Sequence, residues 1–263
     1  MSFEMSRLFR RLNRSLGCCH PSMSDERNPV LVIIDGQEIE IGKIRDILAE
    51  YSLLPGRIVE FLSTGMSRVR MWPDVTRELE RNIGEELGSR TNARSHYDIL
   101  RDALLNELQL DVSDMTPSCG SARLLRSLRD GLTVEPPAFV GGVLYGLEAS
   151  AIPELTIVAQ AINAYARLRD FQTDPIDLVR LTTPTEENNH RDYKELSLNS
   201  FFAAHLKDFE VGHRDGLAKA FGECITLSHD VSNFEAGFEH ALEAMDEWWE
   251  FLACPRELIH QAA

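Results

Sequence analysis

Several features are rare or missing in this sequence, and each absence excludes a class of protein. No apolar stretch approaches the roughly 20 residues of a membrane-spanning helix. The first residues also lack the long apolar segment of a secretory signal. The five cysteines are scattered and form no CxxC pair, which argues against a disulfide framework or a zinc knuckle. We therefore expect a cytoplasmic protein with reduced thiols and no membrane partner.

Positive charge is scarce as well. The chain carries 27 lysines and arginines against 42 aspartates and glutamates, which gives a formal net charge of −15. Nucleic acids and anionic membranes bind to basic surfaces, so neither is expected as a partner. The content of 43% hydrophobic and 26% charged residues is that of an ordinary globular protein.

Signals for β-structure are limited to one run, Val30–Ile34, which stops at Asp35-Gly36. We expect this run to form one short strand or a buried extended entry to the first helix. Elsewhere helical periodicity dominates. It predicts helices over residues 38–52, 55–68, 73–88, 92–109, 119–133, 136–150, 152–170, 192–228 and 231–254.

No change of composition and no repeat divides the chain. The predicted fold is therefore all-α, with a single domain of seven to nine helices over residues 29–258. Residues 1–28 contain a short basic amphipathic segment. We interpret them as a disordered leader rather than as a membrane attachment.

Acids and imidazoles on apolar helix faces stand out, because an unpaired buried charge costs several kcal/mol. In helix 73–88, helical geometry places Glu86 within the apolar stripe around Leu79 and places Glu85 well off it. His96 lies on the apolar stripe of the next helix. Taken alone, these residues are better explained as an acid paired with an arginine and a satisfied core histidine. Together they can converge from two neighbouring helix ends.

Residues 139–152 are apolar almost all round, which is typical of a central helix. Gly141, Gly142 and Gly146 permit close approach by neighbouring helices, at a propensity cost of about 1 kcal/mol each. Glu148 is the only charge in this stretch. A solvated surface carboxylate does not fit such surroundings, so a functional role is predicted for Glu148.

His205 and His213 lie two turns apart on one apolar face of the predicted helix 192–228. Glu210 lies at the edge of this face beside His213, and Asp208 lies further out. An ion-paired surface edge would explain Asp208 but not two inward imidazoles. Glu210 is therefore favoured over Asp208 as the acid of this face.

These residues together predict a metal centre built from Glu86, His96, Glu148, His205, Glu210 and His213. Carboxylates and imidazoles without thiolates suit iron or manganese better than structural zinc. Three carboxylates and three imidazoles can hold two ions, with the central Glu148 as the acid that bridges them. The Glu-x-x-His pair that ferritin-like bundles carry on two helices occurs once in this set, at 210–213, so such a bundle matches poorly.

At these residues the chain resembles the heme-oxygenase-like di-iron oxidases and oxygenases. That all-α family shares its fold with heme oxygenase, thiaminase II and pyrroloquinoline-quinone synthase. The resemblance covers about residues 40–255 and rests on the ordered segments Asn82–Gly88 with His96, Gly142–Glu148, and Phe201-Phe202 with His205, Glu210 and His213. It implies that Glu86, His96, Glu148 and His205 hold a first iron. It further implies that Glu148, Glu210 and His213 hold a second.

One spacing departs from the family pattern His-x-x-x-Asp/Glu-x-x-His. The interval from His205 to Glu210 is one residue longer, whereas Asp208 comes one residue too early. A π-bulge absorbs an extra residue, and such bulges favour functional sites. The acid of the second site therefore stays open between Glu210 and Asp208, and the second iron is allowed to bind weakly or only with substrate.

The resemblance also implies an enzyme with two Fe(II) ions as cofactors and O2 as co-substrate. Family members act on amino acids and fatty acids in natural-product pathways, by desaturation, N-oxygenation, C–C cleavage, or nitrile or alkene formation. Related folds often form homodimers. We expect a small-molecule substrate, an amino acid, with Arg94, Arg101 and Arg191 as candidate carboxylate anchors. Each of the three is otherwise an ordinary surface arginine.

Two other classes of function stay open. A cofactor-free enzyme of the thiaminase-II type needs a nucleophilic cysteine in its pocket, for which Cys224 and Cys119 are the candidates. A non-catalytic helical interaction module predicts instead that the inward acids and histidines pair with arginine or lysine.

Overall fold

A computed structural model of the protein describes residues 3–36, 39–91, 93–133, 135–179 and 197–254. These residues form a helical bundle in a single domain, which confirms the predicted fold class. The elements are α1 (Phe3–Cys19), the 3₁₀ turn η1 (Pro21–Met23), α2 (Pro29–Asp35), α3 (Ile41–Tyr51), the 3₁₀ turn η2 (Pro55–Arg57), α4 (Ile58–Arg68), α5 (Pro73–Glu86), α6 (His96–Leu108), α7 (Cys119–Thr133), α8 (Pro137–Leu168), α10 (Leu198–Ala204), the π-helical turn η3 (His205–Phe209), α11 (Glu210–Cys224) and α12 (Ser228–Ala253).

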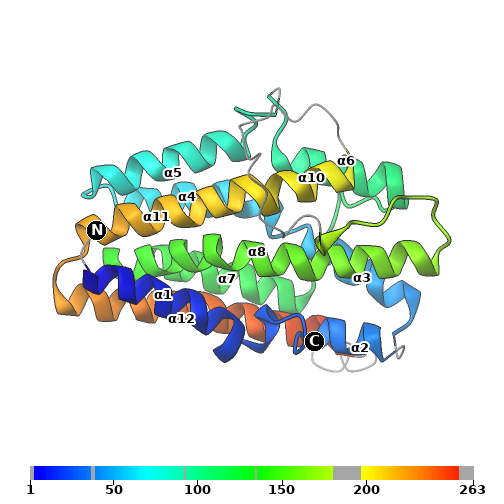
Figure 1. Ribbon diagram of the computed structural model, residues 1–263, viewed down its shortest axis with the longest axis horizontal. Coiled ribbons are helices and arrows are strands. Elements are labelled where there is room, and N and C mark those ends of the chain that lie inside the picture. The colour runs from blue at the N-terminus through cyan, green and yellow to red at the C-terminus, as the bar shows by residue number, and fades with distance from the viewer. Residues whose placement is uncertain (1–2, 37–38, 92, 134, 180–196, 255–263) are drawn as a thin grey trace.

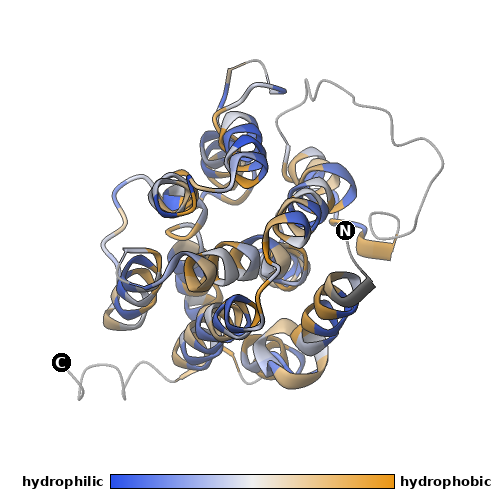
Figure 2. Ribbon diagram, turned by 90° about the vertical axis from the view of Figure 1, so that its left-hand side faces the viewer, coloured by the Kyte–Doolittle hydropathy of each residue, from blue (hydrophilic) through white to orange (hydrophobic). Residues whose placement is uncertain are grey.

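The long helix α8 runs through the middle of the bundle (Figure 1). It contacts α11 on one side and α12 on the other. By length and composition α8 would suffice to cross a membrane, but 78% of its most apolar window is buried inside the bundle. It is therefore the core helix. Figure 2 looks along the helices and shows hydrophilic and hydrophobic residues alternating within them, the pattern of amphipathic helices around a shared core.

The predicted helices 136–150 and 152–170 are one continuous helix, α8, with Pro153 inside it. A proline within a helix removes one hydrogen bond at a cost of about 3 kcal/mol. Here most residues of α8 up to Ser150 and from Glu154 onward are buried, so burial of the continuous apolar helix outweighs the lost bond.

The prediction of a strand or an extended segment at Val30–Ile34 is wrong, because these residues belong to the helix α2. The Asn28 side chain caps this helix by accepting hydrogen bonds from the N–H groups of Val30 and Leu31, and Pro29 occupies its first turn. Val30, Leu31 and Ile34 are buried. Their spacing follows one face of a helix, and tertiary packing outweighs the β-propensity of the run.

The prediction of a disordered leader is also wrong for the described part of residues 1–28. α1 packs on the bundle through an apolar stripe of buried residues, and the hydroxyl of Tyr145 donates to Asn13 at 2.7 Å. His20 is buried between Asp246 at 2.8 Å and Glu239 at 3.0 Å, both on α12. The arginines of α1 lie on its exposed face, while its stripe consists of Met5, Leu8, Phe9, Leu12 and Leu16.

The predicted close approach along α8 is found against α12. A Cβ atom added to Gly142 would clash with the carbonyl oxygen of Phe234, and one added to Gly237 would clash with that of Phe139. The contact is reciprocal, since each helix contributes one glycine to it. This pair of glycines fixes how close the two helices lie.

Candidate metal centre

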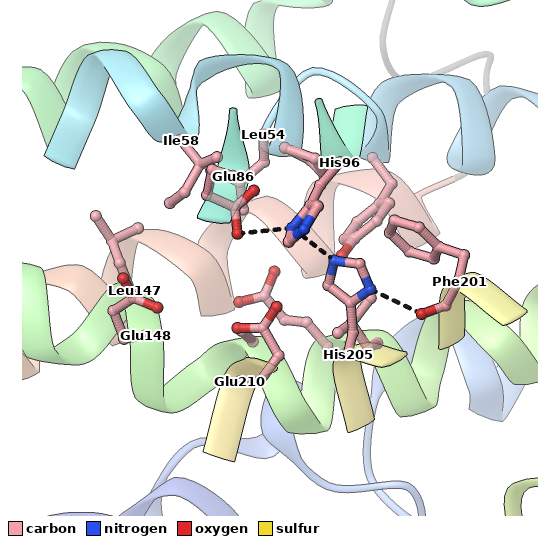
Figure 3. Close-up of a pocket in the computed structure, with 14 residues that line it drawn as sticks. Leu54, Ile58, Glu86, His96, Leu147, Glu148, Phe201, His205 and Glu210 are labelled. Atoms are coloured by element: carbon pink, nitrogen blue, oxygen red, sulfur yellow. Dashed lines mark hydrogen bonds and ion pairs between the residues drawn. The ribbon is translucent and has the colours of Figure 1, made fainter. Parts of the chain in front are cut away.

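The six predicted ligands converge in the interior of the bundle, on α5, α6, α8, η3 and α11, and all six side chains are buried. Figure 3 shows five of them around one cavity. Donor atoms of five of the six, all but Glu148, form two groups, and within each group the atoms lie within 4.8 Å of one another. The first group is Glu86, His96 and His205, and the second is Glu86, Glu210 and His213.

The first group joins the end of α5 to the start of α6. His96 Nδ1 lies 3.1 Å from Glu86 Oε1 and 3.1 Å from His205 Nε2. His205 Nδ1 donates a hydrogen bond of 2.7 Å to the carbonyl oxygen of Phe201. This bond fixes the tautomer of His205, so its Nε2 directs a lone pair toward the group.

Three carboxylates surround His213 on α11, and one of them, Glu210, belongs to the second group. His213 Nε2 lies 3.1 Å from Glu85 Oε2, while His213 Nδ1 lies 3.3 Å from Glu148 Oε2 and 3.9 Å from Glu210 Oε2. Asn82 Nδ2 donates to Glu148 Oε1 at 3.0 Å. A carboxylate on one ring nitrogen orients a histidine and leaves the other nitrogen to a metal. Glu85 is in place to orient His213 in this way.

Glu86 belongs to both groups of donor atoms. Glu148 contacts His213 at one oxygen and Asn82 at the other. The bridging role of Glu148 stays a prediction, and the shared position of Glu86 makes it a second candidate for that role.

The helix that carries the two histidines contains the π-helical turn η3, as the spacing predicted. The N–H of Glu210 bonds to the carbonyl of His205, five residues earlier. The wider turn absorbs the extra residue and brings Glu210 to the cluster. Asp208 forms an ion pair with Arg90 and is partly exposed. The geometry therefore brings Glu210 into the donor set and leaves Asp208 outside it.

Burial and close contacts shift the pKa values of this cluster in opposite directions. Burial alone would raise the pKa of Glu86, but the neighbouring imidazoles, first among them His96, hold it at about 2. Burial lowers the pKa of His205 to about 3. It raises the pKa of Glu210 well above its usual range. The pKa of His213 lies well above its usual range because the surrounding carboxylates outweigh its burial. Such opposed shifts are typical of functional sites.

The residues present fit a centre that holds two divalent cations. Hydrogen bonds satisfy part of the cluster without an ion, but His96 Nε2 is buried without a hydrogen-bond partner among the described residues. An unpaired buried polar atom costs about 1–3 kcal/mol. Carboxylate oxygens and imidazole nitrogens without thiolates are ligands that iron and manganese accept. The donor set and its two groups therefore suit a pair of such ions.

A cavity of about 70 Å³ adjoins the cluster. Its wall includes residues of α3, η2, α4, α8 and α10. Among the lining residues outside the predicted ligand set are Tyr51, Leu54, Ile58, Leu147, Glu154 and Phe201. This volume holds several water molecules or a small organic ligand.

Two acids of this region escaped the sequence analysis. Glu85 was placed off the apolar stripe of its helix, yet it is buried against His213, because α5 packs against α11 as well as α4. Glu154 is buried in α8, six residues after Glu148. The signal for Glu154 resembles the one that identified Glu148, a charge among apolar residues, but Glu154 fell at the start of the separate predicted helix 152–170.

The predicted substrate anchors Arg94 and Arg101 do not line the cavity. Arg94 pairs with Asp102, and Arg101 pairs with Asp98 and Asp102, at the partly exposed surface of α6. The structure does not bring these two arginines to the cavity, because acids of α6 pair with both of them at the surface. Arg191 lies outside the described residues.

The two alternative functions require either a cysteine in the cavity or a pairing of the inward acids with arginine or lysine, and the structure places other groups at the cluster. Cys119 is exposed at the start of α7, and Cys224 at the end of α11 is partly exposed; neither lines the cavity. The acids of the two groups contact imidazoles. Arg90 lies at 3.8 Å from Glu85, outside both groups.

The fold and the site define a class, a single-domain helical bundle with a buried cluster of carboxylates and imidazoles beside a small cavity. The chain belongs to the family described as a domain of unknown function with solved structure, DUF3865, whose model matches residues 6–175 and 187–255.

The chain is also similar to solved structures of a CADD-like protein of unknown function from Nostoc punctiforme. One, at 2.00 Å resolution, has 27% sequence identity and a TM-score of 0.80, and the match covers 96% of this chain and 98% of that chain. Another, at 1.35 Å resolution, has 24% identity and a TM-score of 0.79, covers 99% and 98%, and supports the fold alone. No functionally curated protein matches the sequence.

Proposed function

We propose that the protein is an O2-dependent non-heme di-iron oxidase or oxygenase that acts on a small molecule, with an amino acid as the expected substrate class. The observation that carries the proposal is the convergence of five buried carboxylates and imidazoles into two donor groups that share Glu86, with the buried Glu148 in contact with His213. The resemblance to heme-oxygenase-like di-iron enzymes supports iron over other divalent cations. A cytoplasmic location and a homodimer remain expectations.

The chain's own residues would supply the ligands and their orientation. Two Fe(II) ions, when bound, would supply the activation of O2 needed to oxidise an unreactive bond. The first donor group would hold one ion and the second group the other, with Glu148 beside them. The bond from His205 to the Phe201 carbonyl and the contact of Glu85 with His213 orient both rings before binding. The apolar part of the cavity wall limits access of water to the site.

Anaerobic titration of the metal-free full-length protein with Fe(II) tests the proposal. We expect about two irons per chain, which Mössbauer spectroscopy follows from the ferrous to the ferric state on exposure to O2. Glu148→Ala is expected to abolish this stoichiometry. The control is Glu243→Ala, because Glu243 is an exposed acid on α12, away from the cluster. Absence of iron binding at micromolar concentration would contradict the proposal.

A further inference from the structure

Glu154 is a buried acid of the cavity that belongs to neither donor group. It lies on α8, its exposed fraction is 2%, and it lines the cavity together with the cluster. Its side chain hydrogen-bonds with Ser150, one turn earlier on the same helix. Ser150 in turn donates to the carbonyl of Leu147. The acid thus faces the cavity with a neutral hydroxyl as its hydrogen-bond partner.

No lysine, arginine or histidine other than the two cluster histidines lines this cavity among the described residues. Burial raises the pKa of Glu154 to about 7, which reflects the cost of holding its charge without a cationic neighbour. Buried charges are ordinarily paired, because desolvation is costly. The cavity therefore holds a carboxylate whose natural partner is a cation from outside the chain.

The rest of the wall indicates what such a cation is attached to. Leu54, Ile58, Leu147 and Leu155 offer an apolar surface. Tyr51 adds an aromatic ring to this wall. With a cavity of about 70 Å³, the complementary ligand is a small organic ammonium with a short apolar stem.

We infer that Glu154 anchors the positively charged nitrogen of the substrate, so that the substrate is a primary amine or an amino acid bound through its amino group. This assignment rests on the proposed function, since it places the substrate in the cavity beside the metal centre. Glu154 acts here as a binding residue, while the donor groups are left to the metal. It replaces the expected recognition of a carboxylate by Arg94 or Arg101, which lie elsewhere.

The test compares three probes of equal length, n-pentylamine, pentanoic acid and 1-pentanol, with metal-free full-length protein at pH 8, by isothermal titration calorimetry. We expect the amine to bind at least about tenfold more tightly than the acid or the alcohol, because only the amine forms a charge pair with Glu154. Glu154→Gln should remove this preference, and Glu154→Asp should retain part of it. Glu243→Gln, which removes one exposed acid from α12, should behave as the wild type.

Circular dichroism and the melting temperature establish that each variant is folded. An amine preference that survives in folded Glu154→Gln overturns the inference, and so does a wild type that binds all three probes equally. Anaerobic Fe(II) titration of Glu154→Gln separates this inference from the proposed function. Retention of about two irons per chain supports a role as substrate anchor, whereas loss of iron makes Glu154 a metal ligand and overturns it. A wild type that prefers the amine but binds no iron contradicts the proposed function alone.

Discussion

The two sides of α8 differ in what they bury. Toward α12, the helix presents Gly142. The backbones of α8 and α12 lie so close at this residue that no side chain larger than the hydrogen of glycine fits. Toward α5, α6 and α11, the same helix presents Glu148 and Glu154 to the cluster and its cavity. The first side gains free energy from close apolar packing. On the second side, burying charges costs desolvation free energy, which their mutual contacts need not recover. The comparison indicates that close packing on the α12 side holds α8 in place, while the α11 side presents the buried acids of the proposed metal centre.

The largest effect is expected from breaking the α12 side. Gly142→Ala forces its new methyl group against the carbonyl oxygen of Phe234, and overpacking against backbone should lower the free energy of unfolding by about 3 kcal/mol. Urea denaturation measures it. Gly42→Ala is the control, because a Cβ at Gly42 meets nothing within 4 Å. A Gly142→Ala protein as stable as the wild type would show that the glycine contact does not hold the helices together.

The next effect concerns the other side of α8 and should leave stability nearly unchanged. Burial raises the pKa of Glu210 well above its usual range, which favours the neutral form of this carboxyl in the metal-free protein. Glu210→Gln replaces it with a neutral side chain of the same shape, and the free energy of unfolding should change by less than about 1 kcal/mol. Iron affinity of the second group should fall at least about 100-fold. Calorimetric Fe(II) titration measures the loss, and two intact iron sites in this variant would exclude Glu210 as a ligand.

A smaller effect is expected where α1 joins α12. The pKa of His20 is raised above 6.5, because the contacts with Asp246 and Glu239 outweigh its burial, and the pKa of Asp246 is lowered below 3.8. The raised pKa of His20 means that its contribution is fully present below pH 6.5 and is lost as the pH rises through the folded-state value. The lowered pKa of Asp246 means that its contribution is present above pH 3.8 and is lost as the pH falls through its folded-state value.

The contact therefore stabilises the docked α1 most between these two limits. His20→Gln should lower the free energy of unfolding by about 1 kcal/mol more at pH 6 than at pH 9. Denaturation at both pH values provides the measurement. An equal loss at the two pH values would mean that His20 acts through packing and not through its charge.

The smallest effect is expected for Asp208→Asn, the matched partner of Glu210→Gln. Asp208 forms a partly exposed ion pair with Arg90, and such pairs contribute up to about 1 kcal/mol. Iron stoichiometry should stay that of the wild type in the same Fe(II) titration. Loss of iron in Asp208→Asn, with normal binding in Glu210→Gln, would reverse the assignment of the acid.

Helical periodicity predicted the all-α fold and the inward positions of the six cluster residues, because a lone charge on an apolar face is visible in the sequence itself. The resemblance to the family, and not periodicity, pointed to a π-bulge, because the interval from His205 to Glu210 is one residue longer than the family pattern, and the structure contains this turn as η3. Those predictions succeed because each concerns one helix and one buried face.

The failures have the opposite origin. Glu85 was missed because α5 is buried on two faces, against α4 and α11, and a helical wheel with one apolar stripe treats the second face as solvent. Val30–Ile34 was misread because β-branched composition was given more weight than the cap at Asn28 and Pro29. The packing of α1 depends on α12, more than 200 residues further along the chain, and no local pattern contains that partner.

The glycine contact between α8 and α12 has a mechanical consequence. Two backbones in contact cannot move closer together, so α8 would form the fixed wall of the proposed ion and substrate sites. The opposite wall is different, since η3 carries one residue more than a regular helix requires. A π-helical turn departs from regular helix geometry and is frequent at functional sites. If the proposed Fe(II) ions bind, we therefore expect their effect on hydrogen exchange in the α10–α11 segment, while α8 stays protected.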